Sequence, residues 1–409
     1  MKPEDEFKLN ESDEDEEEFS EDEYDDSEDS DSSTQSSGEQ RKIRRRFRIK
    51  KIGILSAGGD CPGLNALVRA VVKTAQYRYK WRVAGIRDGF EGLVRRPRIS
   101  TLTFDNVTGF QRLAGTVLGT ANRGNPFAWR EEENGNIVTT DYSKKVSGTL
   151  RRQGIDALIV VGGDGTLNIA NEFHELGIKL VGVPKTIDND MPATDISFGF
   201  DTAVHTGVDA IDKIQTTAES HHRVIVIETI GRYTGHIALH SGVAGGADII
   251  LVPEIPFDYN EICRKIFERH KRNRNVTIMC VAEGARPKDG DMVARNTDNT
   301  NGDQPRLGGI GFEVATNVHK LTGLETRYTV LGHLQRGGQA TSSDRLLSTR
   351  LGMAAVHAVA ERKWGRMVVI RGPKIRTVPI AEACGTLRKI DPNGDLVQHS
   401  KLMGISFGD

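Results

Sequence analysis

The sequence predicts an α/β protein with two doubly wound, mostly parallel-sheet domains. Two observations support this prediction. The chain has 409 residues, 37% of them hydrophobic, which is enough for two globular domains of ordinary size. Its middle contains a complete βαβ unit, made of a strand (Leu158–Val161), a glycine turn (Gly162–Gly165), a helix (Leu167–Leu176) and a second strand (Lys179–Val183).

The loops of this unit contain residues suited to phosphate chemistry. Because the crossover is right-handed and the strands are parallel, the loops after both strands emerge at one edge of the sheet. The glycines of the first loop let backbone N–H groups approach a phosphate at a helix N-terminus. Asp164 lies where a Mg²⁺ ion on that phosphate is expected, and Asp188 in the second loop is a candidate general base. Taken alone, Gly-Gly-Asp-Gly also fits an ordinary tight turn with a capping aspartate.

The other expected elements repeat this pattern. An apolar strand, Ile52–Leu55, leads through the loop Ser56–Asp60 into a helix from about Gly63 to Lys73, a second arrangement suited to phosphate binding. Further expected elements are strands at Val83–Arg87, Val224–Ile227 and Ile278–Ala282 and a helix that follows Ala203 and ends near Ala218. Glu283 directly follows the strand Ile278–Ala282, and ligand-contact residues are expected at such carboxyl ends of strands.

The N-terminal 40 residues differ from the rest of the chain. They contain 19 Asp and Glu and only 2 Lys and Arg, whereas the remaining chain has 53 basic and 38 acidic residues. A segment with so few apolar residues cannot bury enough surface to fold, so we predict that residues 1–46, the acidic tail with its basic flank, are disordered. The tail is then a solvated segment, a phosphorylation site at Ser20, Ser27 or Ser30, or a segment that folds back on Arg41–Lys51.

Composition also limits the location and the metal chemistry. No apolar run approaches the length of a membrane span, and the acidic N-terminus suits neither a secretory signal nor a transit peptide, so a cytoplasmic location is expected. The four cysteines show no metal-ligand spacing, which predicts reduced thiols. We expect no membrane and no nucleic acid among the partners, because the basic stretch Arg41–Arg48 directly adjoins the acidic tail.

Five blocks, in order, resemble 6-phosphofructokinases over about residues 50–409. The most specific is Pro184-Lys-Thr-Ile-Asp-Asn-Asp190, which is similar to the catalytic loop of that family; Gly-Gly-Asp-Gly-Thr at 162–166 is shared with NAD kinases and diacylglycerol kinases and does not name the substrate. The other matching blocks are Ser56–Asn65, Gly115–Arg123, Gly231–Gly235 and Leu331–Gly338. Asn122 and Asn125–Phe127 resemble the long, mixed-donor branch of the family.

The resemblance implies phosphoryl transfer from MgATP to the 1-hydroxyl of fructose 6-phosphate. Residues 47–199 are then the donor domain and residues 200–409 the sugar-phosphate domain. The two face a shared active-site cleft, and late segments cross back to the first.

Asp188 is expected to take the hydroxyl proton, with Thr186, Asp190 and Arg232 as the other catalytic residues and Asp164 at the metal. The donor is assigned to Gly58, Arg123, Gly165, Thr166 and Lys185, and the sugar phosphate to Thr186, Asp188, Arg223, Ile230, Gly231, Arg232, Glu283, Arg327, His333 and Arg336.

In the family, Arg223 and Arg327 reach the site of a neighbouring subunit, so a homodimer or homotetramer is expected. Members of the family are often allosteric, and Arg69 and Lys73 lie where some relatives bind effectors, although both also suit a plain helix surface.

Two other functions fit parts of the sequence. A related kinase, such as an NAD kinase, leaves the Asp188–Asp190 loop without a purpose, and a non-catalytic regulatory subunit has no need of Asp164, Asp188 and Arg232 together.

Two positions bear on the phosphoryl donor, and they disagree. Gly165 resembles ATP-using members of the family, whereas Lys185 resembles pyrophosphate-using members. An aspartate at position 165 would project toward the α-phosphate of a nucleotide and repel it, while glycine leaves room and no charge. The charge of Lys185 attracts either donor. The sequence therefore favours ATP, with pyrophosphate as the alternative.

Overall fold

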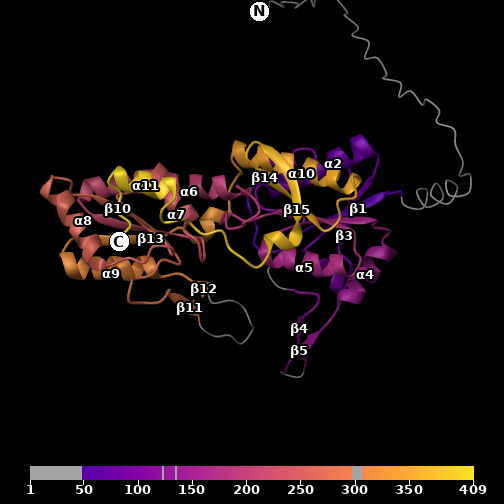
Figure 1. The fold of residues 1–409 in the computed structure, drawn as a ribbon, viewed down its shortest axis with the longest axis horizontal. Helices are drawn as coiled ribbons and strands as arrows, with labels where there is room; N and C mark the ends of the chain where they lie inside the picture. Colours follow the sequence, from indigo (N-terminus) through magenta and orange to yellow (C-terminus); the bar gives the residue numbers. More distant parts are fainter. Residues whose placement is uncertain (1–47, 122–123, 134–135, 297–305) are drawn as a thin grey trace, which may run out of the picture. The chain divides into compact units, whose positions relative to one another are not determined.

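The computed structural model describes residues 48–121, 124–133, 136–296 and 306–409, of which those from residue 49 onward belong to one compact unit (Figure 1). The predicted acidic tail and basic flank, at residues 1–46, lie outside the described residues. So does Arg123, one of the residues assigned to the donor. Among the helices of the described ranges, none is long and apolar enough to cross a membrane.

A seven-stranded sheet contains the βαβ unit that the sequence predicts. Its strand order is β15-β14-β7-β6-β1-β2-β3, and its five central strands are parallel, whereas β3 and β15 run antiparallel at the two edges. The central strands are nearly continuous Val, Ile and Leu runs because both faces of a parallel sheet are covered. The strands are β1 (Lys51–Ser56), β2 (Arg82–Ile86), β3 (Ile99–Leu102), β6 (Ala157–Gly162), β7 (Leu180–Pro184), β14 (Arg366–Arg371) and β15 (Lys374–Pro379).

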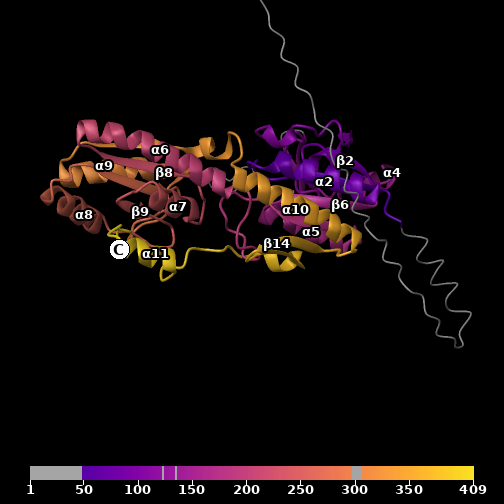
Figure 2. The same cartoon turned by 90° about the horizontal axis from the view of Figure 1, so that it is seen from above.

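Helices cover both faces of this sheet (Figure 2). Successive residues of a strand point to opposite faces, so Ile159 packs in one core and Val160 in the other. The first core includes residues of α2 (Leu64–Tyr79) and α10 (Ser342–Ala360), and the second those of α3 (Glu91–Val94), α4 (Ser143–Arg152) and α5 (Asp164–Glu175). The predicted doubly wound α/β class is confirmed.

A second sheet of four parallel strands has the order β13-β8-β10-β9. Helices α6 and α7 pack on one face with the C-terminal α11, and α8 and α9 pack on the other. The strands are β8 (Val224–Thr229), β9 (Ile249–Leu251), β10 (Thr277–Ala282) and β13 (Thr326–Val330). The helices are α6 (Phe200–His221), α7 (His236–Ala244), α8 (Tyr259–Lys271), α9 (Ile310–Thr322) and α11 (Asp395–Leu402).

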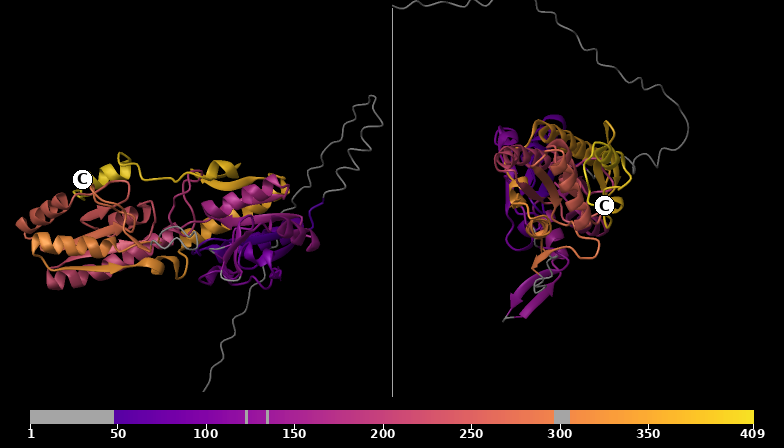
Figure 3. Two further views of the ribbon diagram at one scale, coloured as in Figure 1. Left: turned by 90° about the horizontal axis from the view of Figure 1, so that it is seen from below. Right: turned by 90° about the vertical axis from the view of Figure 1, so that its left-hand side faces the viewer.

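The chain passes between the two sheets three times. After β7 it enters the second sheet through α6, and after β13 it returns through α10 to add β14 and β15 to the first sheet. It then leaves the 3₁₀ turn η4 (Ile380–Ala383) and crosses again to α11, whose Val397 is buried in the core of the second sheet. This last crossing is the yellow segment in Figures 2 and 3.

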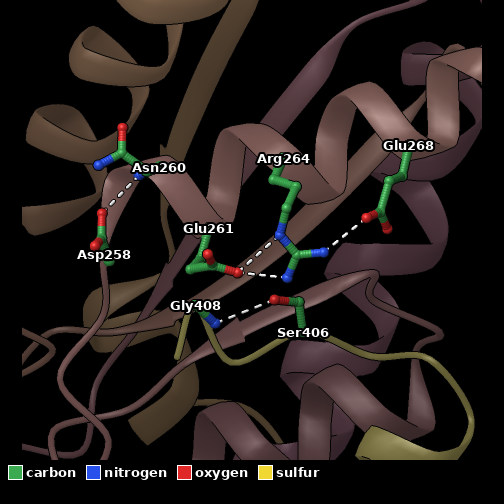
Figure 4. A network of polar contacts seen from close by, with 7 residues as sticks. All are labelled: Asp258, Asn260, Glu261, Arg264, Glu268, Ser406 and Gly408. Carbon is green, nitrogen blue, oxygen red and sulfur yellow. Dashed lines mark hydrogen bonds and ion pairs between the residues drawn. The ribbon is translucent and has the colours of Figure 1, made fainter.

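The chain end is fixed beside the start of α8 (Figure 4). Asp258 caps this helix by accepting from the Asn260 N–H at 2.8 Å, and its own N–H donates to the Gly408 carbonyl at 2.7 Å. Ser406 accepts from the Gly408 N–H at 3.1 Å. The ion pairs of Arg264 with Glu261 and Glu268 along α8 are exposed, so they contribute little to stability.

Several elements differ from the sequence-based expectations. Helix α2 continues to Tyr79, because no glycine or proline interrupts residues 74–79, and α5 begins at Asp164 rather than at Leu167. The hairpin formed by β4 (Trp129–Glu133) and β5 (Asn136–Thr140) was not expected. The remaining short elements are β11 (Ala294–Asn296), β12 (Arg306–Leu307), η1 (Phe110–Arg112) and η3 (Gly332–Arg336).

The cysteines are free, as predicted. Cys61 is buried beside Gly199, which has a φ of 93° at the start of α6. A Cβ atom at Gly199 would lie 2.1 Å from the Cys61 Sγ, so this approach of two loops requires glycine.

Candidate active site

The predicted site residues come mainly from the loops after parallel strands. Gly58 follows β1, Asp164 follows β6, and the loop 185–190 follows β7 in the first sheet. In the second sheet, Ile230–Arg232 follows β8 and Glu283 follows β10. His333 and Arg336 lie in η3, just beyond β13. Ligands of open α/β sheets bind at such carboxyl ends, which explains why residues distant in sequence gather there.

Hydrogen bonds between these loops join the two sheets. Arg336 of η3 donates from Nη1 to the Asp60 carbonyl in the loop after β1, at 3.3 Å. A Cβ atom at Gly59 would lie 2.8 Å from the same Nη1 atom, so glycine lets the guanidinium approach that loop. The Thr234 hydroxyl, in the loop after β8, reaches the Asp188 carbonyl at 3.5 Å. Residues of both sheets therefore form one site.

The loop 185–190 is held in a tight, largely buried conformation. The Asp188 N–H donates to the Thr186 hydroxyl at 3.0 Å, and the Ser197 hydroxyl donates to the Thr186 carbonyl at 2.6 Å. Asn189 has a φ of 55°, and its side-chain oxygen accepts from the Ser197 N–H at 3.1 Å. These contacts fix the backbone on both sides of Asp188, a residue that is only 7% exposed.

The electrostatics of this loop are unfavourable for a carboxylate. Burial, and then the nearby charge of Asp190, raise the pKa of Asp188 from 3.8 to about 6, although Arg336 and Arg232 oppose the shift. Burial also raises the pKa of Asp190. The Asp188 Oδ1 atom is buried and has no hydrogen-bond partner among the described residues. A buried acceptor without a partner is costly, and a ligand hydroxyl would satisfy it.

The loop after β8 presents Arg232 with its backbone in a strained conformation. Arg232 has a φ of 51°, and its N–H and that of Gly231 donate to Glu283 Oε1 at 2.8 and 3.2 Å. The Ile230 N–H donates to the side-chain oxygen of Gln335 at 3.0 Å. Burial raises the pKa of Glu283, and its position beneath two amides indicates that it shapes this loop.

Lys185 is buried beneath the loop after β1. Its ammonium donates to the carbonyls of Ala57, at 2.8 Å, and Gly59. Burial lowers the pKa of Lys185 to about 8. The Gly58 N–H donates to the Ala121 carbonyl at 3.0 Å. Lys185 therefore supports this loop from below.

Asp164 and Gly165 occupy the first turn of α5. Asp164 accepts from the Gly385 N–H at 2.9 Å and from the Asn168 side chain at 3.3 Å. Gly165 is exposed, and a Cβ atom there would meet no atom within 4 Å. The next residue, Thr166, is buried, and its hydroxyl would lie 3.4 Å from a Cβ atom at Gly58.

Among the described residues, no group of three or more Asp, Glu, His or Cys side chains is arranged to hold a metal ion. A magnesium ion is usually held by one or two carboxylates together with substrate phosphates, so such a cage is not required. Asp164 also raises the pKa of Asp190, which shows that these carboxylates repel one another. A divalent cation would relieve this repulsion, so the residues present fit magnesium.

A family model described as phosphofructokinase matches residues 51–359. The chain belongs to the phosphofructokinase family. An ATP-dependent 6-phosphofructokinase of Chloroflexus aurantiacus is 48% identical over 88% of this chain and 98% of that protein. A pyrophosphate–fructose 6-phosphate 1-phosphotransferase of Streptomyces coelicolor is 46% identical over 84% of this chain and 96% of that protein. The solved phosphofructokinase of Saccharomyces cerevisiae has a TM-score of 0.69 and 33% identity over 82% of this chain, which spans about half of the yeast chain, namely 45%.

Two arginines that the phosphofructokinase resemblance assigns to the sugar phosphate lie elsewhere in this chain. Arg223 precedes β8 and Arg327 lies near the start of β13, so both are at the amino ends of strands whose carboxyl ends face the site. A strand as long as β8 spans roughly 17 Å. Both arginines pair with Glu325 at 2.7 Å. The structure therefore does not bring them to the Asp188 site of the same chain.

Sequence reasoning missed two residues of this phosphofructokinase site. Gln335 is fully buried and joins the loop after β8 to α6, since it also donates to the Ala203 carbonyl at 3.1 Å. It lies inside the block Leu331–Gly338, so its burial there could have been suspected. Arg388 contacts the loop that contains Asp190, and no sequence motif surrounds it.

We predict that the ligand-free phosphofructokinase becomes more stable when Asp188 is replaced by asparagine. Because the folded protein binds a proton at Asp188 up to about pH 6 and the unfolded chain only up to 3.8, stability falls as pH rises through this window. At pH 8 Asp188→Asn should add up to about 3 kcal/mol to the free energy of unfolding, and below pH 4 almost nothing. Urea unfolding at both pH values measures this.

The matched control for this experiment is Asp212→Asn, at an exposed position of α6. It should change the unfolding free energy by less than about 0.5 kcal/mol at either pH. Equal effects of Asp188→Asn at pH 4 and pH 8 would show that burial of the charge is not what destabilises the loop.

Proposed function

We propose that this chain is an ATP-dependent 6-phosphofructokinase, which transfers the terminal phosphoryl group of MgATP to the 1-hydroxyl of fructose 6-phosphate. The products are fructose 1,6-bisphosphate and ADP, in the glycolytic reaction, and we expect it in the cytoplasm. The main support is the buried Asp188, whose Oδ1 has no hydrogen-bond partner in the part of the chain that the structure describes, while its carboxylate lies in the fields of Arg232 and Arg336. Its relative in Chloroflexus aurantiacus has the same named activity.

Each of the proposed site residues has its own chemical role. Asp188 accepts the proton of the sugar hydroxyl, for which a raised pKa is suitable because it matches the base to neutral pH. Arg232 stabilises the charge that develops on the transferred group, and Thr186 and Asp190 orient the reactants. We assign to the sugar phosphate Glu283, Ile230, Gly231, His333 and Arg336. We assign to the donor Gly58, Gly165, Thr166 and Lys185, together with Arg123, which lies outside the described residues.

Asp164 would hold a magnesium ion, which would supply positive charge that neutralises the phosphates of the donor. We assign residues 47–199 to the donor and residues 200–409 to the sugar phosphate, with β14 and β15 as late strands that rejoin the first sheet. A non-catalytic regulatory subunit is the alternative from another class. It is disfavoured because burial of the Asp188 carboxylate lowers stability, a cost that a general base for the reaction would explain.

Asp188→Asn tests the general base. In an assay coupled through aldolase, the unmodified chain should produce fructose 1,6-bisphosphate, and the variant should lose about 10²–10⁴-fold in kcat. The affinity for fructose 6-phosphate, measured by calorimetry, should remain within about tenfold, because the change is isosteric. A chain without any product would refute the proposed function, whereas an active Asp188→Asn variant would refute only the assignment of the base.

The donor proposal rests on the open space at Gly165, where an added Cβ atom would meet no atom within 4 Å. We expect a higher kcat/KM for MgATP than for magnesium pyrophosphate. Gly165→Asp should reduce kcat/KM for ATP about tenfold or more while affecting pyrophosphate much less, because the charge repels the additional phosphate. The neutral, isosteric Gly165→Asn is the matched control and should retain most ATP use. Equal losses with both donors would show that charge at this position does not select the donor.

The assembly proposal rests on Arg223 and Arg327, which Glu325 holds together at the amino ends of their strands. We propose a homodimer or homotetramer in which these arginines complete the sugar-phosphate site of a neighbour. Sedimentation velocity should show a dimer or larger species at concentrations where the enzyme is active. A fully active monomer would contradict this arrangement.

A further inference from the structure

The segment that crosses from η4 to α11, Cys384–Asp391, contacts the site from the outside, and we call it the C-terminal strap (Figures 2 and 3). Arg388 is its central residue and is partly buried. The side chains on either side of it, Leu387 and Lys389, are exposed. Of these three neighbouring residues, Arg388 is therefore the one whose side chain packs against the rest of the protein.

Among the described residues, the Arg388 guanidinium donates its hydrogen bonds to a single loop. Nε and Nη2 donate to the Asn189 carbonyl at 3.1 and 2.7 Å. Nη1 donates to the carbonyls of Thr194 and Asp195 at 2.9 and 2.6 Å. The backbone N–H of Arg388 adds a fifth hydrogen bond, to the Asp190 carbonyl at 2.7 Å. A single residue thus joins both ends of the segment 189–195.

This loop needs such support. Asn189 has a φ of 55°, a left-handed conformation that costs a non-glycine residue free energy and persists only where the surroundings enforce it. Its two neighbours are the buried Asp188 and the partly buried Asp190, whose carboxylates repel each other. The planar guanidinium fork presents several N–H groups in fixed directions and can therefore hold several carbonyls at once.

The strap is itself fixed at both ends. On the donor side, the Gly385 N–H donates to Asp164 at 2.9 Å. On the side of the second sheet, His236 Nε2 donates to the Arg388 carbonyl at 2.9 Å, and the Ile390 N–H donates to Glu254 at 3.0 Å. Glu254 also accepts from the Gly235 N–H at the start of α7. Arg388 is therefore held in place from both sheets.

We propose that Arg388 is a positioning residue, which sets the backbone of residues 189–195 so that Asp188 and Asp190 have the geometry that phosphoryl transfer requires. This inference rests on the proposed function for its kinetic consequences. Small displacements of reacting groups lower the rate more than they lower binding, since orientation matters most in the transition state.

The kinetic test compares Arg388→Ala and Arg388→Lys with the exposed neighbour Lys389→Ala. Arg388→Ala should lower kcat about 10- to 100-fold, with much smaller changes in KM for both substrates. Arg388→Lys should be almost as slow, because an ammonium keeps the charge but lacks the fork. Millimolar guanidinium should restore part of the activity of Arg388→Ala alone. Lys389→Ala should stay within about twofold of the unmodified chain.

A second measurement does not depend on activity. Hydrogen–deuterium exchange of the peptide that spans residues 189–197 should accelerate in Arg388→Ala, while exchange in β8 and α8 stays unchanged and Lys389→Ala shows no difference. Unchanged exchange in this peptide, or an Arg388→Lys variant with full kcat, would overturn the proposal. Faster exchange in a chain that never phosphorylates fructose 6-phosphate would instead support the role of Arg388 and refute the proposed function.

Discussion

The fold of the site depends on two carboxylates being held together away from water. Asp188 is buried, Asp190 is partly buried, and the two carboxylates raise the free energy of the folded state when both are charged. Such a loop would relax if only its own residues held it. Contacts from Ser197 and Thr234, together with Arg388 from the far end of the chain, keep the backbone in place, so the stability of the surrounding sheets maintains a locally unfavourable arrangement.

The topology explains why these supports can reach one loop. Every parallel strand of either sheet delivers its following loop to a carboxyl edge, and three passages of the chain between the sheets bring the two edges to a common site. Arg336 beside the loop of Gly59, and the Thr234 hydroxyl at the Asp188 carbonyl, are direct contacts across this junction. Side chains at the amino ends, such as Arg223 and Arg327, are excluded from it by the length of the strands.

The sequence was sufficient for the parts of the site that are local. The apolar run 158–161, the glycine turn and the loop 184–190 each show their structure within a few residues, and the carboxyl-edge rule then brings Asp164 and Asp188 together. Arg388 could not be predicted in this way, because the carbonyls it binds lie 193 to 199 residues earlier in the chain. A side chain that binds only backbone carbonyls also imposes no particular residue type on its partners, so nothing in the partner sequence points to it. The hairpin of β4 and β5 was missed because its strands are largely polar and exposed.

By resemblance, Gly165 indicates ATP and Lys185 indicates pyrophosphate as the donor. The surroundings of the two residues reduce this conflict. Two of the three N–H groups of the Lys185 ammonium donate to carbonyls of the loop after β1, and burial lowers the pKa of this group. Its bonds support the loop after β1, and its charge is partly compensated by those carbonyls. Gly165, by contrast, is exposed, and no atom lies within 4 Å of the position of an added Cβ, so the first atom of a side chain there would lie in open space. ATP is larger than pyrophosphate by a nucleoside and one phosphate. A residue that selects between the two donors must lie where this additional part has room, and the open position of Gly165 suits that role better than the buried position of Lys185.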